Sequence, residues 1–170
     1  AAVQLASPVA SGPLFDDGLD PDALGEECGL IAESRFPDPI QLVREYLLRD
    51  ADGEFLRAEP WLPTATLCPN SIPGYDVATL IEGFEIGQVT LHPDTVRVPV
   101  TYERIGEMSS GLAFEYNPRI ETDTFTVVRT RYGWRIDGPA WWWQVSAYTA
   151  LDRFQFMPED RELIEGHVVW

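Results

Sequence analysis

The stretch from residue 79 to residue 137 alternates apolar and polar side chains, and it constrains the fold more than any other part of the chain. Such alternation is typical of β-strands with one buried face, because successive side chains point to opposite faces of a sheet. The predicted strands are residues 80–91, 95–108, 120–131 and 134–137. Residues 109–118 form an expected connection, and residues 132–133 an expected hairpin turn in which glycine permits positive φ. With Gly83 and Gly87 as expected bends, the sequence predicts a curved antiparallel sheet of about four strands.

Helical spacing precedes and follows this stretch. Asp38 can cap a helix and Pro39 suits its first position, and the apolar residues that follow recur at helical spacing as far as Arg49 and Asp50. A turn and a second, shorter helix are expected over residues 52–58, and a short helix over residues 146–154. The fold class is therefore α+β, with the sheet packed on N-terminal helices.

The length of 170 residues suits one domain with flanking segments. Hydrophobic residues make up 45% of the chain, which is too many for a disordered protein. We predict a flexible acidic segment over residues 1–26, a domain over residues 27–157 and a C-terminal tail over residues 158–170.

The net charge of −16 argues against nucleic acid and anionic membrane surfaces as partners, because both are negatively charged. No run approaches the roughly 18 apolar residues of a membrane-spanning helix. All 12 basic residues are arginine, so Schiff-base chemistry and a P-loop lysine are excluded.

The two cysteines, Cys28 and Cys68, are expected to form a disulfide. The chain opens with small residues and not with methionine, which favours a secreted or periplasmic bacterial protein whose signal segment has been removed. In an oxidising compartment the bridge would close a loop of about 40 residues and stabilise the fold by about 4 kcal/mol. The alternative is a pair of buried thiols.

Metal and cofactor signatures are missing from the sequence. The acidic run at residues 16–22 lacks the spacing of a calcium loop. The two histidines and two cysteines lack the spacing of zinc ligands, and no phosphate-cradling glycine loop is present. We therefore predict neither a metal site nor a cofactor.

The predicted hairpin carries a family resemblance. The run Thr126-Val127-Val128-Arg129, followed by Gly133-Trp134-Arg135-Ile136 and then Pro139, resembles the NTF2-like superfamily, the cystatin-like α+β group that includes SnoaL and ketosteroid isomerase. The early helix at residues 43–48 is also similar. The resemblance implies a cone-like fold with a pocket between sheet and helices, and it covers members that are isomerases or cyclases, binding domains, or dimers formed through the sheet.

Several side chains are candidates for lining such a pocket. The aromatic candidates are Tyr46, Trp61, Tyr102, Trp134 and Trp142. Core packing is the default for most of them, but three successive tryptophans at residues 141–143 cannot all be buried on one side of a strand. Arg129 can bind a carboxylate if it faces a cavity, or it can form an ion pair with Glu121 or Asp123 on its own strand or with a neighbouring strand.

Asp137, at the end of the last predicted strand, is the one catalytic candidate. Its carboxylate can act as a general base at the pocket mouth, or it can hydrogen-bond the turn at Gly138. We expect a non-catalytic domain that binds a small apolar ligand or a protein partner. The alternatives are an isomerase-type or cyclase-type enzyme, with Tyr46 or Tyr102 as hydrogen-bond donor, and a module that dimerises through its sheet.

Overall fold

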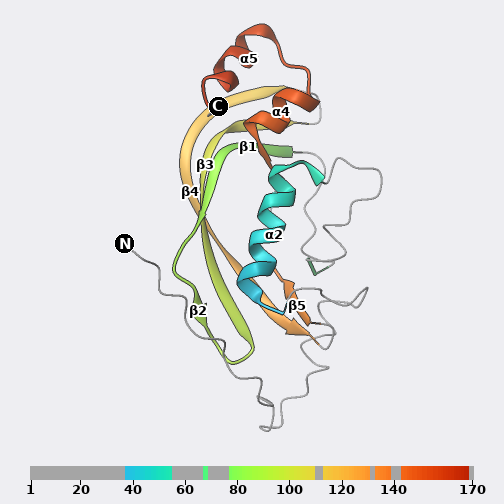
Figure 1. The fold of residues 1–170 in the computed structure, drawn as a ribbon. Coiled ribbons are helices and arrows are strands. Elements are labelled where there is room, and N and C mark those ends of the chain that lie inside the picture. Colours follow the sequence, from blue (N-terminus) through green and yellow to red (C-terminus); the bar gives the residue numbers. More distant parts are fainter. Residues whose placement is uncertain are drawn as a thin grey trace.

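The chain folds into a strongly curled, mostly antiparallel sheet accompanied by helices (Figure 1). The computed structural model describes residues 37–54, 67–68, 77–109, 113–130, 133–138 and 143–168. The strands are β1 (Val77–Ile86), β2 (Thr90–Leu91), β3 (Thr95–Ser109), β4 (Phe114–Thr130), β5 (Gly133–Ile136) and β6 (Trp143–Ser146). The three helices in this part of the chain are α2 (Pro39–Ala51), α4 (Ala147–Arg153) and α5 (Pro158–Glu165). The protein is therefore α+β, as predicted.

The sheet has six strands instead of the expected four. Its order is β5-β4-β3-β1-β6, and the short strand β2 pairs with β3. β6 lies parallel to β1, while every other pair is antiparallel. Register shifts interrupt the β1–β3 ladder before Gly83 and the β3–β4 ladder between Arg104 and Gly106. Gly83 is thus a bend site as predicted, and Gly133 takes the expected positive φ of 102°.

β4 begins earlier than the sequence predicts. The expected connection over residues 109–118 is wrong in its second half, because the strand already starts at Phe114 and runs through Pro118. The register shift lies opposite residues 117–118, where the ladder omits two residues of β4. A proline, which has no amide hydrogen to donate, is tolerated at such an irregularity on an edge strand.

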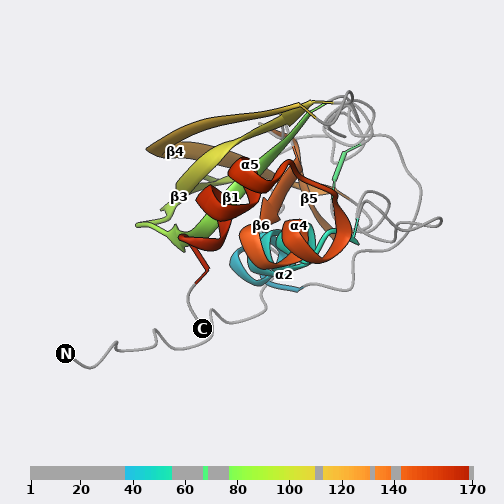
Figure 2. The same ribbon diagram turned by 90° about the horizontal axis from the view of Figure 1, so that it is seen from above.

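Helix α2 begins and ends at the predicted places. The Asp38 carboxylate accepts hydrogen bonds from the backbone amides of Ile40 (2.7 Å) and Gln41 (3.3 Å), and Pro39 occupies the first turn. The helix contacts β6, β5 and β3 through one apolar face. The buried apolar residues of that face are Leu42, Val43, Tyr46 and Leu47. Viewed from above, α2 lies across from the β1–β3–β4 part of the sheet (Figure 2).

The C-terminal segment is helical where a tail was expected. Ser146 caps α4 through a hydrogen bond from the Thr149 amide (3.2 Å), so the helix predicted over residues 146–154 is confirmed. α5 follows, with Pro158 in its first turn, and contacts α4 and β4. Ile164 of α5 is fully buried in the same hydrophobic cluster as α2 and the sheet. This segment therefore belongs to the folded domain.

The core lies on the inner face of the curl. Val98 of β3 is paired with Phe125 of β4, and Val96 with Val127, so these side chains share one face. All four belong to one continuous cluster of buried residues that also contains the apolar face of α2. Within the described residues, no helix is both long enough and apolar enough to cross a bilayer.

Candidate functional site

A buried carboxyl group, that of Asp50, lies where α2 meets β6. Asp50 follows Tyr46 by one helical turn, on the buried side of α2, and it is fully buried. Its Oδ2 accepts a hydrogen bond from the backbone amide of Gln144 (3.0 Å), while its Oδ1 has no hydrogen-bond partner among the described residues. Loss of solvation raises the pKa of Asp50 well above its ordinary value, and the Gln144 amide and the Tyr46 hydroxyl only partly oppose this. Burial therefore favours the neutral form of this carboxyl group.

Two tyrosines share this part of the core with Asp50. Burial raises the pKa of both Tyr46 and Tyr102 well above the usual value, and the Asp50 carboxyl adds to the rise for each. The Tyr46 ring packs edge-to-face on Phe125 with centroids 5.8 Å apart. The guanidinium of Arg104 lies 5.4 Å from the centre of the Tyr102 ring. The two tyrosines predicted to line a pocket are thus packed inside the core.

This group has the composition of a catalytic site but not the access of one. A carboxyl group with two phenols can transfer protons or stabilise an oxyanion. Asp50 is 0% exposed, however, and Tyr46 and Tyr102 are each 1% exposed. A substrate atom therefore cannot reach these groups in this conformation, and the hydrogen bond to Gln144 gives Asp50 a structural role in tying α2 to β6.

Asp137 lies elsewhere, in an exposed position after β5. Its backbone amide donates to the Thr126 carbonyl (2.8 Å), and the Thr126 amide donates to the Gly138 carbonyl (2.6 Å). These bonds extend the β4–β5 hairpin. The catalytic role of Asp137 stays a prediction.

Within the described residues, Glu121 and Asp123 pair with Arg104, and no ion pair joins either carboxylate to Arg129. Arg129 is exposed on β4, and its guanidinium lies 5.9 Å from the ring centre of Trp134, its direct neighbour on β5. The pair forms a cation–π contact on the surface of the hairpin.

Three of the predicted site residues, Trp61, Trp142 and Cys28, lie outside the described residues. Cys68 is fully buried, and its backbone amide donates to the Ile136 carbonyl (2.8 Å). The disulfide between Cys28 and Cys68 stays a prediction.

An ion-pair network covers the inner face of β3 and β4 beyond the core. Arg104 binds Asp123 (2.9 Å) and also Glu121, and Arg119 binds Glu121 (3.0 Å) and Glu107 (2.7 Å). The hydrogen bond from Arg119 to Glu107 is the main cause of the raised pKa of the Arg119 guanidinium. Loss of solvation raises the pKa of Asp123, with Arg104 opposing the rise. On the inner face of β4, charged residues thus replace apolar ones N-terminal to Phe125.

The open edge of β4 is the most extended unpartnered feature in the described part of the chain. β5 pairs with residues 127–130 of β4 only, so residues 114–125 are bonded in the described sheet to β3 alone. The Thr126 amide and carbonyl both point away from β3, toward Gly138 and Asp137. Ile120 is 76% exposed on this edge. A strand edge of this kind can accept another strand.

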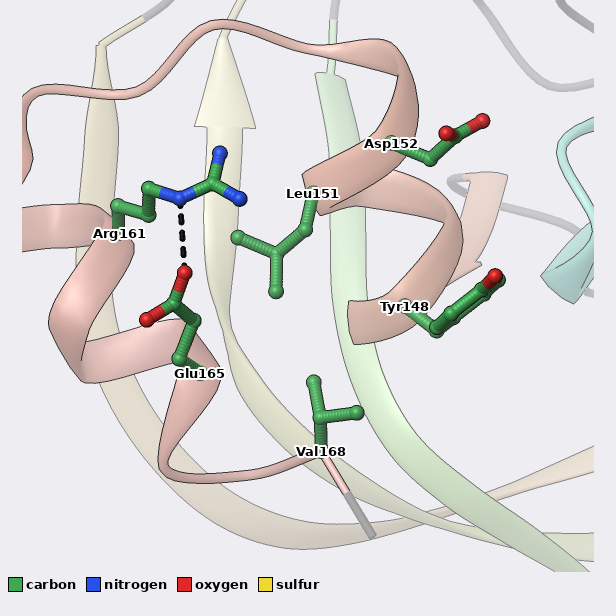
Figure 3. A pocket seen from close by; sticks show the side chains of 6 residues that line it. All are labelled: Tyr148, Leu151, Asp152, Arg161, Glu165 and Val168. Atoms are coloured by element: carbon green, nitrogen blue, oxygen red, sulfur yellow. Dashed lines mark hydrogen bonds and ion pairs between the residues drawn. The ribbon is translucent and has the colours of Figure 1, made fainter. Parts of the chain in front are cut away.

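A separate cleft of about 210 Å³ lies between α4 and α5 (Figure 3). Leu151 and Val168 project into it from the two sides, and an ion pair between Arg161 and Glu165 (2.7 Å) forms part of its wall. Tyr148 and Asp152 complete the lining. None of these residues is among the site candidates that the sequence predicts. Within the described ranges, no three histidine, cysteine or acidic side chains gather to hold a metal ion.

Neither Asp50 nor the β4 edge is among the site candidates predicted from the sequence, and the reasons differ. Asp50 could have been found, because it continues the apolar stripe of α2 four residues after Tyr46. The open edge could not, since it depends on where β5 stops pairing.

Comparison with known proteins finds no family model, curated protein or solved structure that matches this chain.

Proposed function

We propose that this chain is a non-catalytic NTF2-like domain, with the cone-like arrangement typical of that superfamily, from a secreted or periplasmic protein. Its function is to bind a protein partner that adds an extended strand to the open edge of β4. The single observation that carries this proposal is that, among the strands the structure describes, residues 114–125 of β4 pair with β3 alone, with Ile120 exposed among them.

Three features support binding over catalysis. The buried carboxyl of Asp50 is closed to solvent, and the predicted base Asp137 is exposed. The edge offers backbone donors and acceptors that a second strand can satisfy. The curled sheet and the β4–β5 hairpin support the superfamily assignment, which rests on the resemblance of the hairpin sequence.

The binding proposal is tested by titrating isotope-labelled full chain with short strand-forming peptides of basic, neutral and acidic composition. We expect at least one peptide to shift the amide resonances of Ile120, Thr122 and Thr124 in a saturable way. Ile120→Lys should abolish the shifts, because a charge at the centre of the edge disfavours strand addition. Leu91→Lys is the matched control, since Leu91 is similarly exposed (70%) but lies on β2. Unchanged β4 resonances with all three peptides would overturn the proposal.

The cleft between α4 and α5 favours a second candidate, the binding of a small apolar molecule. Leu151 and Val168 give the cleft an apolar part beside three charged side chains, and its volume of about 210 Å³ suits a small ligand. Nile red serves as an uncharged probe, and we expect saturable fluorescence that Leu151→Trp removes by filling the cleft. Leu163→Trp, at a partly exposed position of α5 outside the lining, should keep the signal. Equal signals from both variants would exclude the cleft.

A further inference from the structure

We propose that the partner is a second copy of this chain, paired antiparallel with the β4 edge across a two-fold axis through Ile120. This inference rests on the proposed function, since it names the strand that the open edge accepts.

The direction of the backbone groups on the edge follows from the hairpin. Both backbone groups of Thr126 bond away from β3, and the Arg129 amide bonds back toward the β3 side at Asp94. Outward and inward residues alternate along an antiparallel strand. The N–H and C=O groups of Thr124, Thr122 and Ile120 therefore point out from the open edge. Two copies can bond reciprocally through Ile120, which is the geometry of a hydrogen-bonded pair on a two-fold axis.

Charge selects this register from the alternatives. With the axis at Ile120, Arg119 of each copy lies directly opposite Glu121 of the other copy, on the same face. An axis at Thr122 instead places Glu121 opposite Asp123 of the second copy, and an axis at Glu121 places that carboxylate opposite itself. Opposite charges in direct cross-strand pairs stabilise a sheet, whereas like charges destabilise it. The register centred on Glu121 also sets Arg119 opposite Asp123, but it keeps the like-charged pair at its centre. Among these three registers, only the one centred on Ile120 joins opposite charges without a like-charged pair, and it also brings the two exposed isoleucines together.

The outer face of the sheet is less suited to self-association than the edge. On this face, Glu103 of β3 is paired with Ile120 of β4. Thr101, two residues before Glu103 on β3, is paired with Glu85 of β1. Both glutamates are exposed. Two copies stacked face to face would bring these carboxylates together, whereas edge pairing leaves them in solvent. A dimer formed through the sheet is one alternative that the sequence predicts, and we place the interface of that dimer at the β4 edge.

The resulting dimer is weak and depends on salt. Pro118, which lies opposite Thr122 of the second copy, has no amide hydrogen, so the central pairing supplies about four inter-chain backbone hydrogen bonds. An interface of that size is transient. Each copy carries a net charge of −16, so added salt strengthens the dimer by screening the repulsion between copies. A basic partner strand would show the opposite dependence on salt.

Sedimentation of the full chain over a range of protein and salt concentrations tests the inference. We expect a monomer–dimer equilibrium that shifts toward dimer as salt is added. Ile120→Lys should abolish the dimer, and Leu91→Lys should leave it unchanged. Arg119→Glu should weaken the dimer roughly tenfold, because it creates two like-charged pairs per dimer.

Mixing Arg119→Glu with Glu121→Arg supplies a rescue that only this register predicts. In the mixed dimer each glutamate faces an arginine, so the mixture should associate more strongly than either variant alone. Glu121→Arg also removes a partner of Arg104, and circular dichroism checks that it folds. If Glu121→Arg does not fold, the effects of Ile120→Lys and Arg119→Glu on dimer formation test the inference without it.

A monomer at every concentration, or a dimer that both Ile120→Lys and Arg119→Glu leave intact, would overturn the inference. If the chain is monomeric while peptides still shift the β4 resonances, the second copy is wrong and the binding function stands. If peptides also fail, both proposals are wrong.

Discussion

Replacing Asp50 with asparagine should change how the stability of the protein depends on pH. Asp50 is fully buried, and burial raises the pKa of its carboxyl well above the ordinary value of 3.8. In the unfolded chain the carboxyl is hydrated and loses its proton at its ordinary pKa. Between the two pKa values, the folded protein therefore holds one proton more at this site than the unfolded chain does.

The sign and the size of the effect follow from proton linkage. A carboxyl whose pKa is raised by folding contributes stability that is fully present below the unfolded pKa and is lost as the pH rises through the folded pKa. The free energy of unfolding of the wild type should thus fall, relative to Asp50→Asn, by about 1.4 kcal/mol per pH unit above roughly pH 4. The fall should level off once the folded carboxyl ionises. Asparagine keeps an oxygen that can accept the Gln144 amide.

Urea unfolding of both proteins at half-unit pH intervals measures this difference directly, because slopes from all other carboxylates cancel in the comparison. Asp152→Asn, at an exposed position of α4, controls for removing one negative charge from an acidic protein. If the curves of wild type and Asp50→Asn run parallel from pH 4 to pH 8, Asp50 is ionised in the folded state and the reasoning from burial fails.

Three further predictions, tested by four substitutions, concern the packing and the ion pairs of the fold. Gly106→Ala should lower the free energy of unfolding by about 1–3 kcal/mol in chemical denaturation, because its Cβ would collide with the Glu115 carbonyl oxygen. Gly83→Ala is the control: its Cβ would meet nothing within 4 Å, so it should cost less than about 0.5 kcal/mol or stabilise the protein. Arg104→Gln should lower stability by about 1–3 kcal/mol and should raise the pKa of Asp123 measured by NMR titration, because it removes the positive charge that lowers this pKa. An unchanged titration of Asp123 would contradict the ion pair. Ile164→Ala should cost about 2–4 kcal/mol if α5 is part of the core, and a loss below 0.5 kcal/mol would show that α5 packs loosely.

Local sequence signals predicted the local structure well. The cap at Asp38 and the proline after it placed the start of α2, and the alternation from Val96 to Tyr102 placed β3. These signals work because they report bonds and burial within one element. The alternation stops at Ile120 toward the N-terminal end of β4, where the strand faces solvent and charged residues, so its start at Phe114 was missed.

The pairing of distant elements was not predictable in the same way. β6 joins the sheet beside β1, which is more than sixty residues earlier in the chain, and α5 adds Ile164 to a core built mainly by other elements. The candidate site shows the same division. Tyr46 was predicted to line a pocket, with core packing as the alternative, and it is packed in the core. The open edge exists because β5 is short, which is a property of the pairing and not of any motif.

Amide hydrogen exchange at Thr122 tests the central claim, that the β4 edge is free in the single chain and becomes paired on binding. In dilute protein the outward Thr122 amide should exchange far faster than the amides of Glu121 and Asp123, which point toward β3. As the concentration of the chain rises into the range of dimer formation, exchange at Thr122 should slow while its two neighbours stay unchanged. A Thr122 amide that is equally protected at every dilution would mean that the edge is already covered within one chain, and the account would be wrong.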